Sequence, residues 1–248
     1  MARVTGTDLA RVTARTSLLQ ATWNYERQQG LGWAWCFAPV LQRLYPDAAT
    51  RRARLAEHTA YFNTQPTLAS LALGAVARLE EQRAMTGSDD DGVARVKTLL
   101  GSALAALGDR LFWFTLRPFA ACLGVLLALQ GSWAGALALL VCYNAFHLTL
   151  RLRGVAWGYR LGAEVLSEGL RGRLERAVRT TATFGAALVG LLVAALLVPG
   201  GVPQSLTFQA TLAGGLTLGL ITAQRSRPTP THWALGAGVL CLVAAWFR

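Results

Sequence analysis

Long apolar stretches fill the sequence from Leu111 onward, and they limit what this chain can fold into more than any other feature. Five of them follow one another, at 111–130, 133–150, 184–199, 205–222 and 233–247. A helix needs about 20 residues to cross the hydrocarbon core of a bilayer. The first two stretches are long enough. The other three are at or below the usual lower limit, so we expect some of them to thin the bilayer or to be re-entrant.

The sequence therefore predicts an all-α fold, that of a polytopic membrane protein. N-terminal interfacial or amphipathic helices are followed by about five apolar membrane helices. The expected regions are 1–110, a cytoplasmic-side, membrane-associated helical region; 111–150, the first membrane hairpin; 151–183, an Arg-rich cytoplasmic connection; and 184–248, the C-terminal membrane segments.

The arginines are distributed as expected for connections on the cytoplasmic side of a membrane. The net charge of +11 fits either a nucleic-acid-binding protein or a membrane protein. Seven arginines lie in 151–179, and Arg225 and Arg227 lie in the next-to-last connection. The turns at 131–132 and 200–204 carry none. By the positive-inside rule the N-terminus is cytoplasmic and the C-terminus outside. Because the arginines follow membrane sidedness, we expect no nucleic-acid binding.

The first 110 residues are expected to be helical and to associate with the membrane, and they have no apolar segment typical of a signal peptide. Trp23, Trp33 and Trp35 stand close together in a stretch interrupted by Gly30, Gly32 and Pro39. This stretch fits a helix in the membrane interface or one that covers the membrane bundle equally well. Asp47 is a suitable cap for a helix over 48–61, and a second helix is expected over 67–81.

The residue patterns of the common catalytic and metal sites are absent. His58, His147 and His232 have no zinc-like spacing, and the four cysteines form no CxxC pair. There is no phosphate-binding loop, GxSxG turn or dinucleotide fingerprint. The aspartates at 89–91 lack the spacing of a calcium loop. The sequence therefore predicts no catalytic residue, no metal site and no cofactor.

Polar residues in the apolar stretches are the remaining candidates. Asp109 precedes the first stretch, Arg117 and Pro118 fall within it, and Asn144 and His147 lie in the second. An ionisable group in a membrane segment is costly unless it is paired, so each is a functional candidate. Arg117 fits a functional role or snorkelling to the inner interface equally well. Pro118 is expected to break its helix and free backbone carbonyl groups.

Several blocks of residues carry a family resemblance. They are Leu19-Gln-Ala-Thr-Trp-Asn-Tyr-Glu-Arg27, Arg43-Leu-Tyr-Pro46, Tyr61-Phe-Asn-Thr-Gln-Pro66, Leu79-Glu-Glu-Gln82, Gly108-Asp109, Phe112-Trp113, Arg117-Pro118, Tyr143-Asn144 and the glycines from Gly154 to Gly162. Their order and approximate spacing over 15–162 resemble the IID membrane subunit of the mannose–fructose–sorbose class of the bacterial sugar phosphotransferase system.

This resemblance implies a sugar permease subunit of the bacterial plasma (inner) membrane that pairs with a IIC membrane subunit. IIA and IIB phosphocarrier proteins would supply the phosphate for a hexose, so the chain itself would not be an enzyme. An oligomer of IIC–IID pairs is expected. A non-transporting family member, acting as a membrane scaffold or regulatory platform for phosphotransferase proteins, is the alternative. Outside the family, a lipid-modifying enzyme using Asp109 and His147 is a third hypothesis.

Polar residues in the matching blocks are the expected site. A neutral sugar is recognised through amides, carboxylates and hydroxyls, because each sugar hydroxyl needs donors and acceptors. We predict that the substrate-binding residues are Asn63, Gln65, Asp109 and Thr115, and that the structural or site-supporting residues are Asn24, Glu26, Arg117 and Asn144. His58 is expected to be structural.

The chain departs from the family pattern beside Asp109. The family usually has a Gly-Pro-Leu-Ala-Gly run before this position, whereas residues 102–107 read Ser-Ala-Leu-Ala-Ala-Leu here. These residues favour a continuous helix, where glycine and proline would permit a tight or broken backbone. Phe114 stands where a glycine is usual, and Arg110 is expected to pair with Asp109.

Overall fold

The structure, a computed structural model, describes residues 2–87 and 92–197. Its helices are α1 (Gly6–Arg15), η1 (Thr16–Leu18), α2 (Gly30–Leu44), α3 (Ala48–His58), α4 (Ala69–Thr86), α5 (Gly92–Leu111), η2 (Phe112–Leu116), α6 (Arg117–Ala128), α7 (Ala134–Leu161), η3 (Gly162–Leu166) and α8 (Glu168–Leu197). In these ranges only isolated β-bridges accompany the helices, as predicted for an all-α protein. The chain divides into two compact units, Met1–Val189 and Gly190–Arg248. Of the second unit, only the last turns of α8 are described.

Local sequence signals explain where the first helices begin. Thr5 caps α1 through a reciprocal pair of hydrogen bonds with Asp8, and Asp47 caps α3 by accepting a hydrogen bond from the Thr50 amide at 2.7 Å. The predicted cap at Asp47 is therefore confirmed, although α3 ends at His58, three residues before the predicted end.

The prediction that Gly30, Gly32 and Pro39 interrupt the tryptophan-rich stretch is wrong, because α2 starts at Gly30 and includes Pro39. The glycines permit close contact instead: a Cβ atom at Gly32 would lie only 1.8 Å from the Leu19 carbonyl oxygen. One face of α2, including Trp33, is buried against α1, α3 and α4. Helix α2 thus packs among the N-terminal helices, while Leu31 and Trp35 on its other face are exposed.

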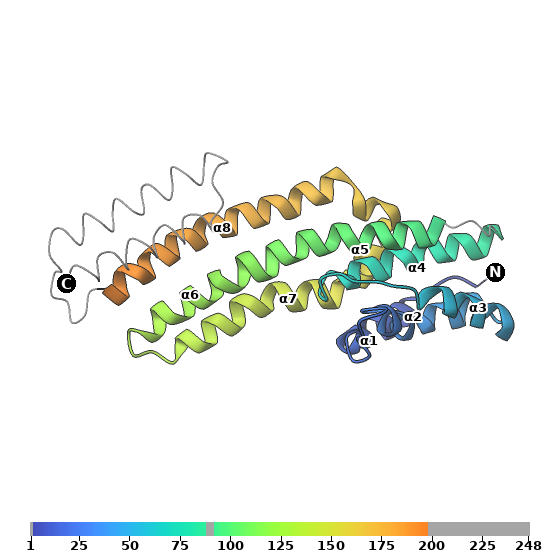
Figure 1. Ribbon diagram of the computed structural model, residues 1–248, viewed down its shortest axis with the longest axis horizontal. Coiled ribbons are helices and arrows are strands. Elements are labelled where there is room, and N and C mark those ends of the chain that lie inside the picture. Colours follow the sequence, from blue (N-terminus) through green and yellow to red (C-terminus); the bar gives the residue numbers. More distant parts are fainter. Residues whose placement is uncertain (1, 88–91, 198–248) are drawn as a thin grey trace. The chain divides into compact units, whose positions relative to one another are not determined.

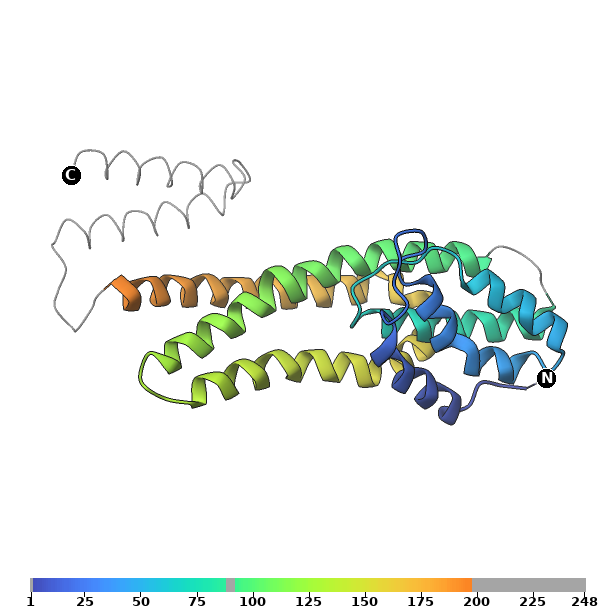
Figure 2. The ribbon, with the colours of Figure 1, turned by 60° about the horizontal axis from the view of Figure 1, so that its bottom comes forward.

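Close packing of α4 on α7 holds the N-terminal helices to the long helices of the first unit. A Cβ atom at Gly74 would lie 2.0 Å from the Val155 carbonyl oxygen, and one at Gly158 would lie 2.0 Å from the Leu71 carbonyl oxygen. The Ser70 hydroxyl donates a hydrogen bond across this contact to the Leu150 carbonyl, at 3.0 Å. Figures 1 and 2 show α1–α3 gathered beside α4, at the end of α7 away from the α6–α7 turn. Small residues thus let the two backbones touch.

Helix α5 continues through the π-helical turn η2 into α6, so one helix runs from Gly92 to Ala128. The sequence predicted a break at Pro118, and this prediction is wrong. A π turn shifts the hydrogen-bond register, and the Arg117 amide donates to the Phe112 carbonyl. Pro118 then lies in the first turn of α6, where its missing N–H costs little. The first apolar helix therefore begins well before Leu111.

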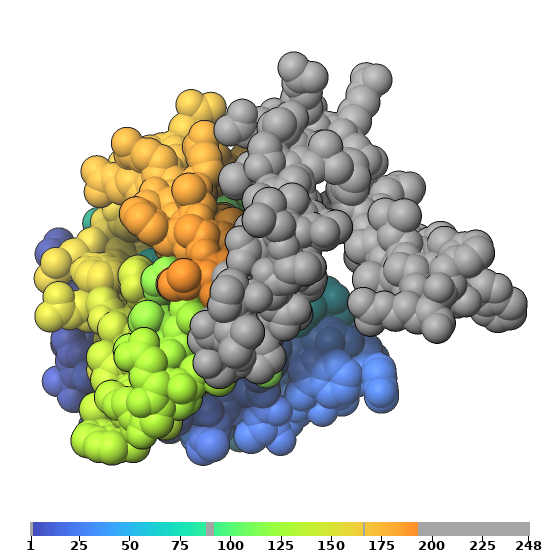
Figure 3. Space-filling view, turned by 90° about the vertical axis from the view of Figure 1, so that its left-hand side faces the viewer, coloured from blue at the N-terminus to red at the C-terminus, as the bar shows by residue number. Residues whose placement is uncertain are grey.

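Two helical stretches, Gly92–Ala128 and Ala134–Val165, are long and apolar enough to cross a membrane. They form a hairpin whose tip Figure 3 shows in yellow-green, and the backbones meet closely there, since a Cβ atom at Gly135 would lie 2.3 Å from the Gly124 carbonyl oxygen. About five membrane helices were predicted, and the described residues contain these two.

The remaining three predicted apolar segments lie partly or wholly outside the described residues. The segment 184–199 begins within α8, and the described part of that helix ends at Leu197. The segments 205–222 and 233–247 lie outside the described residues. The Arg-rich stretch 151–183 is made of the end of α7, η3 and the start of α8.

Candidate functional site

An extended segment, residues 59–68, which we call the strap, carries two of the predicted substrate-binding residues. Gln29, at the start of α2, holds it in place. The Gln29 side-chain amide donates to the Thr64 carbonyl at 2.7 Å, and its oxygen accepts from the Thr64 amide at 3.1 Å. The Gln29 backbone amide also donates to the Phe62 carbonyl at 2.8 Å. Gln29 therefore supplies hydrogen-bond partners for the Thr64 amide and carbonyl and for the Phe62 carbonyl, groups that a neighbouring strand would pair with in a sheet.

The strap lies along α5, because two glycines of that helix leave room for it. A Cβ atom at Gly101 would lie 3.4 Å from the Asn63 carbonyl oxygen, and one at Gly108 would lie 2.4 Å from Cβ of Gln65. Asp109 follows Gly108 directly. The structure therefore places Gln65 against α5 one residue before Asp109 and Asn63 about two turns earlier along that helix; Asn63 is exposed and Asp109 half-buried.

Gln65 and Thr115 are buried, in contrast to Asn63. The Gln65 side-chain oxygen accepts hydrogen bonds from the Thr67 and Leu68 amides, at 2.7 and 3.0 Å. It thereby satisfies N–H groups at the start of α4 that would otherwise lack partners. Thr115 lies inside the π turn, beyond Asp109 along the same continuous helix.

Asp109 does not pair with Arg110 as the sequence predicted. Among the described residues, no hydrogen bond or ion pair involves the Asp109 carboxylate, and none joins it to His147. The reason is geometric, because consecutive helical residues point about 100° apart and do not face each other. The carboxylate is thus left with capacity to accept hydrogen bonds from a ligand.

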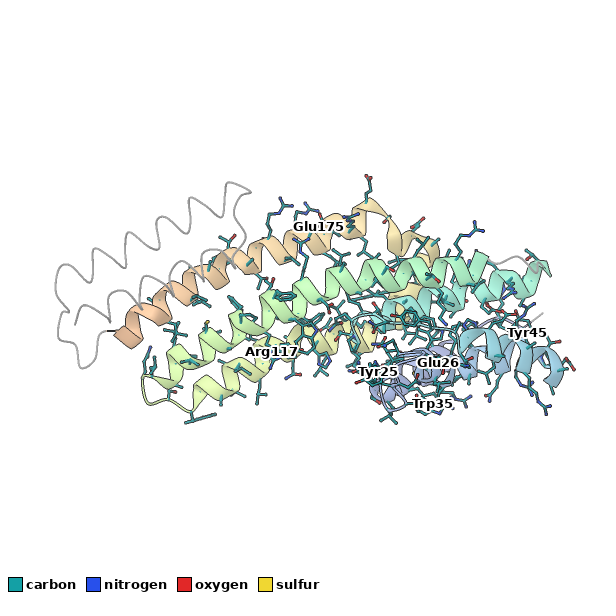
Figure 4. All side chains as sticks on the ribbon, viewed as in Figure 1. Tyr25, Glu26, Trp35, Tyr45, Arg117 and Glu175 are labelled. Atoms are coloured by element: carbon teal, nitrogen blue, oxygen red, sulfur yellow. The ribbon has the colours of Figure 1, made fainter. Side chains whose placement is uncertain are left out.

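Asn24 and Glu26 belong to the loop before α2. The Asn24 side-chain oxygen accepts from the Arg27 amide at 2.8 Å and shapes this turn. Glu26 is exposed, and its carboxylate lies 3.6 Å from the Arg27 guanidinium. Tyr25 and Trp35, labelled with Glu26 in Figure 4, are exposed aromatic side chains. Asn24 therefore supports local structure, whereas Glu26 makes only a weak surface pair.

Arg117 and Asn144 lie on the membrane hairpin, away from the strap (Figure 4, where Arg117 is labelled). The Arg117 guanidinium lies over the Trp113 ring, 5.3 Å from its centroid. The Asn144 amide donates to the Leu140 carbonyl one turn earlier, at 2.9 Å. These two residues are separate from the group around Asp109.

A buried charged network that sequence reasoning missed lies behind the strap. The Glu80 side chain is fully buried; it accepts a hydrogen bond from the Tyr45 hydroxyl at 2.7 Å and lies 3.5 Å from Nε2 of His58. The Trp33 indole donates to Nδ1 of His58, which assigns the ring proton to the nitrogen facing Glu80. The Lys97 ammonium group donates to the His58 carbonyl at 2.9 Å.

Burial sets the protonation of this network. Burial lowers the pKa of His58 below its usual value and outweighs the attraction of Glu80, so the imidazole is neutral near pH 7. Burial alone would raise the pKa of Glu80, but hydrogen bonds with His58 and Tyr45, together with the Arg83 charge, hold it below its usual value. His58 is therefore structural, as predicted, with both ring nitrogens directed at neighbouring side chains.

Glu81 is a second buried carboxylate that was missed. It accepts hydrogen bonds from the Val4 amide at 2.8 Å, from Arg78 at 2.9 Å and from the Tyr159 hydroxyl. These partners join the N-terminal segment and α7 to α4. In the sequence, Glu80 and Glu81 stand out only as members of the family block Leu79–Gln82. Their burial could not be expected, because charged residues at the end of a helix usually face water.

Within 2–87 and 92–197, no group of three or more His, Cys, Asp or Glu side chains is placed to hold a metal ion. The arrangement near Asp109 instead offers an exposed amide and a half-buried carboxylate beside a rigidly held segment. These are groups that can bind the hydroxyls of a neutral polar ligand.

Comparisons with known proteins agree on one family. A family model described as the IID component of the mannose/fructose/sorbose family of the phosphotransferase system (PTS) matches residues 3–222. The mannose-specific EIID component of Escherichia coli K12 is 38% identical over 198 residues, which are 79% of this chain and 68% of that protein. The sorbose-specific EIID component of Klebsiella pneumoniae is 37% identical over 79% of this chain and 70% of its own length. The fructose permease IID component of Bacillus subtilis is 34% identical over the same shares.

Solved structures are similar as well. The cryo-EM structure of the mannose transporter ManYZ in complex with microcin E492 contains a chain that is 36% identical, with a TM-score of 0.62 over 78% of this chain and 71% of that one. A second structure, described as a membrane protein, is 29% identical, with a TM-score of 0.69 over 97% of this chain and 96% of its own.

Proposed function

The chain belongs to the mannose/fructose/sorbose family of phosphotransferase-system IID components, and from this membership we propose that it is the IID subunit of a hexose permease. It is a membrane permease subunit for phosphotransferase-system sugar uptake. The family match over residues 3–222 carries the proposal. Two apolar helices long enough to span, and the similarity to a mannose transporter, agree with the membrane setting.

The proposed partners are a IIC membrane subunit, with which the chain forms IIC–IID pairs that oligomerise, and IIA and IIB phosphocarriers that phosphorylate the hexose. The surroundings of His58 support the proposal that phosphate is carried by IIA and IIB and not by this chain. Its imidazole is buried between Trp33 and Glu80, so a phosphocarrier could not reach it. We place the complex in the bacterial inner membrane. The arginine distribution supports a cytoplasmic N-terminus, an outer C-terminus and about five passages.

The proposed sugar site is built on the strap and α5. Asn63 and Asp109 are the residues with polar groups available for sugar hydroxyls. Gln65, buried beside α5, shapes the site through packing and hydrogen bonds, and we propose that the buried Thr115 contributes from the π turn further along the same helix. Each hydroxyl can donate to the Asp109 carboxylate or exchange hydrogen bonds with the Asn63 amide. We propose that Asn24 and Glu26 have a structural role in the loop before α2, and that Arg117 and Asn144 have one in the membrane hairpin.

Uptake coupled to phosphorylation tests the proposal. Cells that lack their own hexose permeases would express this chain with the IIC, IIA and IIB proteins encoded beside it, and labelled hexose phosphate would be measured. We expect accumulation that depends on this chain and that falls at least tenfold in Asp109→Asn. Asp47→Asn is the matched control, because asparagine is an equally good helix cap. Unchanged uptake with Asp109→Asn would refute the role of that carboxylate.

A non-transporting scaffold remains the second candidate because of one observation. Helix α5 runs unbroken through residues 102–109, where the family pattern expects a glycine- and proline-rich run. Under this hypothesis the chain would be present in the membrane with IIC, but no sugar phosphate would accumulate for any hexose tested. Uptake that requires this chain would exclude the scaffold hypothesis.

A further inference from the structure

A cavity of about 380 Å³ lies between α7 and the start of α8, with Leu71 of α4 also in its wall. Its apolar walls come from Leu150, Trp157 and Leu161 of α7 on one side and from Leu170 and Leu174 of α8 on the other. All five side chains are only partly buried. The two helices therefore leave room between them for an apolar ligand.

Two arginines, Arg160 and Arg173, also line this cavity. Both are exposed, and neither makes an ion pair or side-chain hydrogen bond with any residue that the structure describes. Arg171, by contrast, pairs with Glu175 at 2.9 Å. Two unpaired guanidinium groups at one cavity call for an anionic ligand, and guanidinium suits phosphate because it can donate two parallel hydrogen bonds.

The cavity combines apolar walls with a charged end, as a membrane lipid does. Leu150 is the last residue of the predicted membrane hairpin, and Arg160 lies ten residues further along α7, about 15 Å at the helical rise. One end is apolar, and the other carries the charges, with Trp157 near them. Tryptophan is enriched at the interface between bilayer and water. The cavity thus extends from the cytoplasmic end of the hairpin, with cations at its far end.

We propose that this cavity binds one anionic glycerophospholipid, with its phosphate between Arg160 and Arg173 and an acyl chain against Trp157 and Leu174. Basic pockets between membrane helices on the cytoplasmic side bind anionic head groups. The bound acyl chain completes the packing of α8 on α7. The inference does not depend on the proposed transport function, because it uses only the membrane setting and this cavity.

Trp157 is the natural reporter for this site. The purified full-length chain in detergent micelles would be titrated with phosphatidylglycerol whose acyl chains are brominated, because bromine quenches tryptophan fluorescence on contact. The quenching specific to the site is the part that Trp157→Phe removes. We expect this part to saturate with brominated phosphatidylglycerol at a concentration at least fivefold lower than with brominated phosphatidylcholine.

Two double substitutions distinguish lipid binding at the cavity from nonspecific attraction of the lipid to positive charge. The double substitution Arg160→Gln/Arg173→Gln should raise the half-quenching concentration of phosphatidylglycerol at least fivefold. Arg176→Gln/Arg179→Gln is the matched control, because both arginines are exposed on α8 outside the cavity and removing them changes the net charge equally. This control should change the value less than twofold. Leu174→Phe, which keeps both arginines and narrows the apolar part of the cavity, should also raise the half-quenching concentration of phosphatidylglycerol.

Three results would overturn the inference. Equal quenching by phosphatidylcholine would mean that Trp157 meets ordinary surrounding lipid. An equal loss in the control pair would mean that general positive charge attracts the lipid. Competition by glycerol 3-phosphate alone would mean that the arginines bind a soluble phosphate. Circular dichroism of every variant identifies misfolded protein, and in that case Leu174→Phe decides the question with the arginines intact.

Discussion

Replacing Gly158 by alanine tests the packing that joins the N-terminal helices to the membrane hairpin. A Cβ atom at this position would lie 2.0 Å from the Leu71 carbonyl oxygen and 2.9 Å from the Ala75 amide nitrogen. Ordinary contact begins near 3.4 Å, so α4 and α7 must separate by roughly 1.4 Å. Both contacts are to backbone atoms, so no rotamer change relieves them. Separation also weakens the hydrogen bond from Ser70 to the Leu150 carbonyl.

The magnitude follows from two opposing effects. Overpacking costs about 1–3 kcal/mol and sometimes more, and loss of the Ser70 hydrogen bond adds about 1 kcal/mol. Alanine recovers about 1 kcal/mol through its higher helix propensity. We expect Gly158→Ala to lower the free energy of unfolding by about 1–3 kcal/mol. For a chain of this length that corresponds to a fall in Tm of about 2–12 °C.

Thermal unfolding of the purified chain in detergent, followed by circular dichroism, measures this change. Gly172→Ala on α8 is the matched control: no atom lies within 4 Å of the added methyl group, so this variant should be as stable as the wild type or slightly more so. A Tm for Gly158→Ala equal to that of the wild type would refute the packing argument. An equal fall in both variants would refute it too.

Three further predictions concern the strap and the helices around it. Gln29→Ala leaves the buried amide and carbonyl of Thr64 without partners, so we expect a loss of about 2–4 kcal/mol and faster proteolysis of the strap, measured by limited digestion. Because the folded-state pKa of His58 is lowered, the unfolded chain binds a proton first. The contribution of His58 to stability should be constant above pH 6.5 and fall as the pH drops below it, and His58→Gln should reduce this slope in denaturant titrations. Asp47→Ala should cost about 1 kcal/mol through loss of the α3 cap, whereas Asp47→Asn should cost almost nothing in the same assay.

Features with local causes could be read from the sequence. Asp47 was identified as a cap because aspartate before a helical pattern satisfies free amides of the first turn. The hairpin of 111–150 was identified because long apolar stretches have few other stable places. The family resemblance, now confirmed, came from blocks of residues in a fixed order.

Features that depend on residues far apart in the sequence could not be predicted from local sequence patterns. Gln29 gives no local sign that it binds Thr64, 35 positions later. Glu80 and Glu81 lie at the charged end of a helix, a pattern typical of an exposed face, and only Tyr45, Tyr159 and Val4 make their burial tolerable. Pro118 was expected to break its helix, because the preceding π turn is not encoded by any simple residue pattern.

The unbroken course of α5 limits how this chain can recognise a sugar. In a broken helix, free backbone carbonyl and amide groups can bind substrate. Here the backbone groups around Asp109 are used within the helix, since α5 continues directly into η2. The Thr64 backbone on the facing strap is likewise occupied by Gln29. In the proposed sugar site, recognition would therefore rely mainly on side chains such as those of Asn63 and Asp109. Because an amide and a carboxylate bind hydroxyls only within hydrogen-bond reach, the position of the strap on α5 decides which hydroxyls are read.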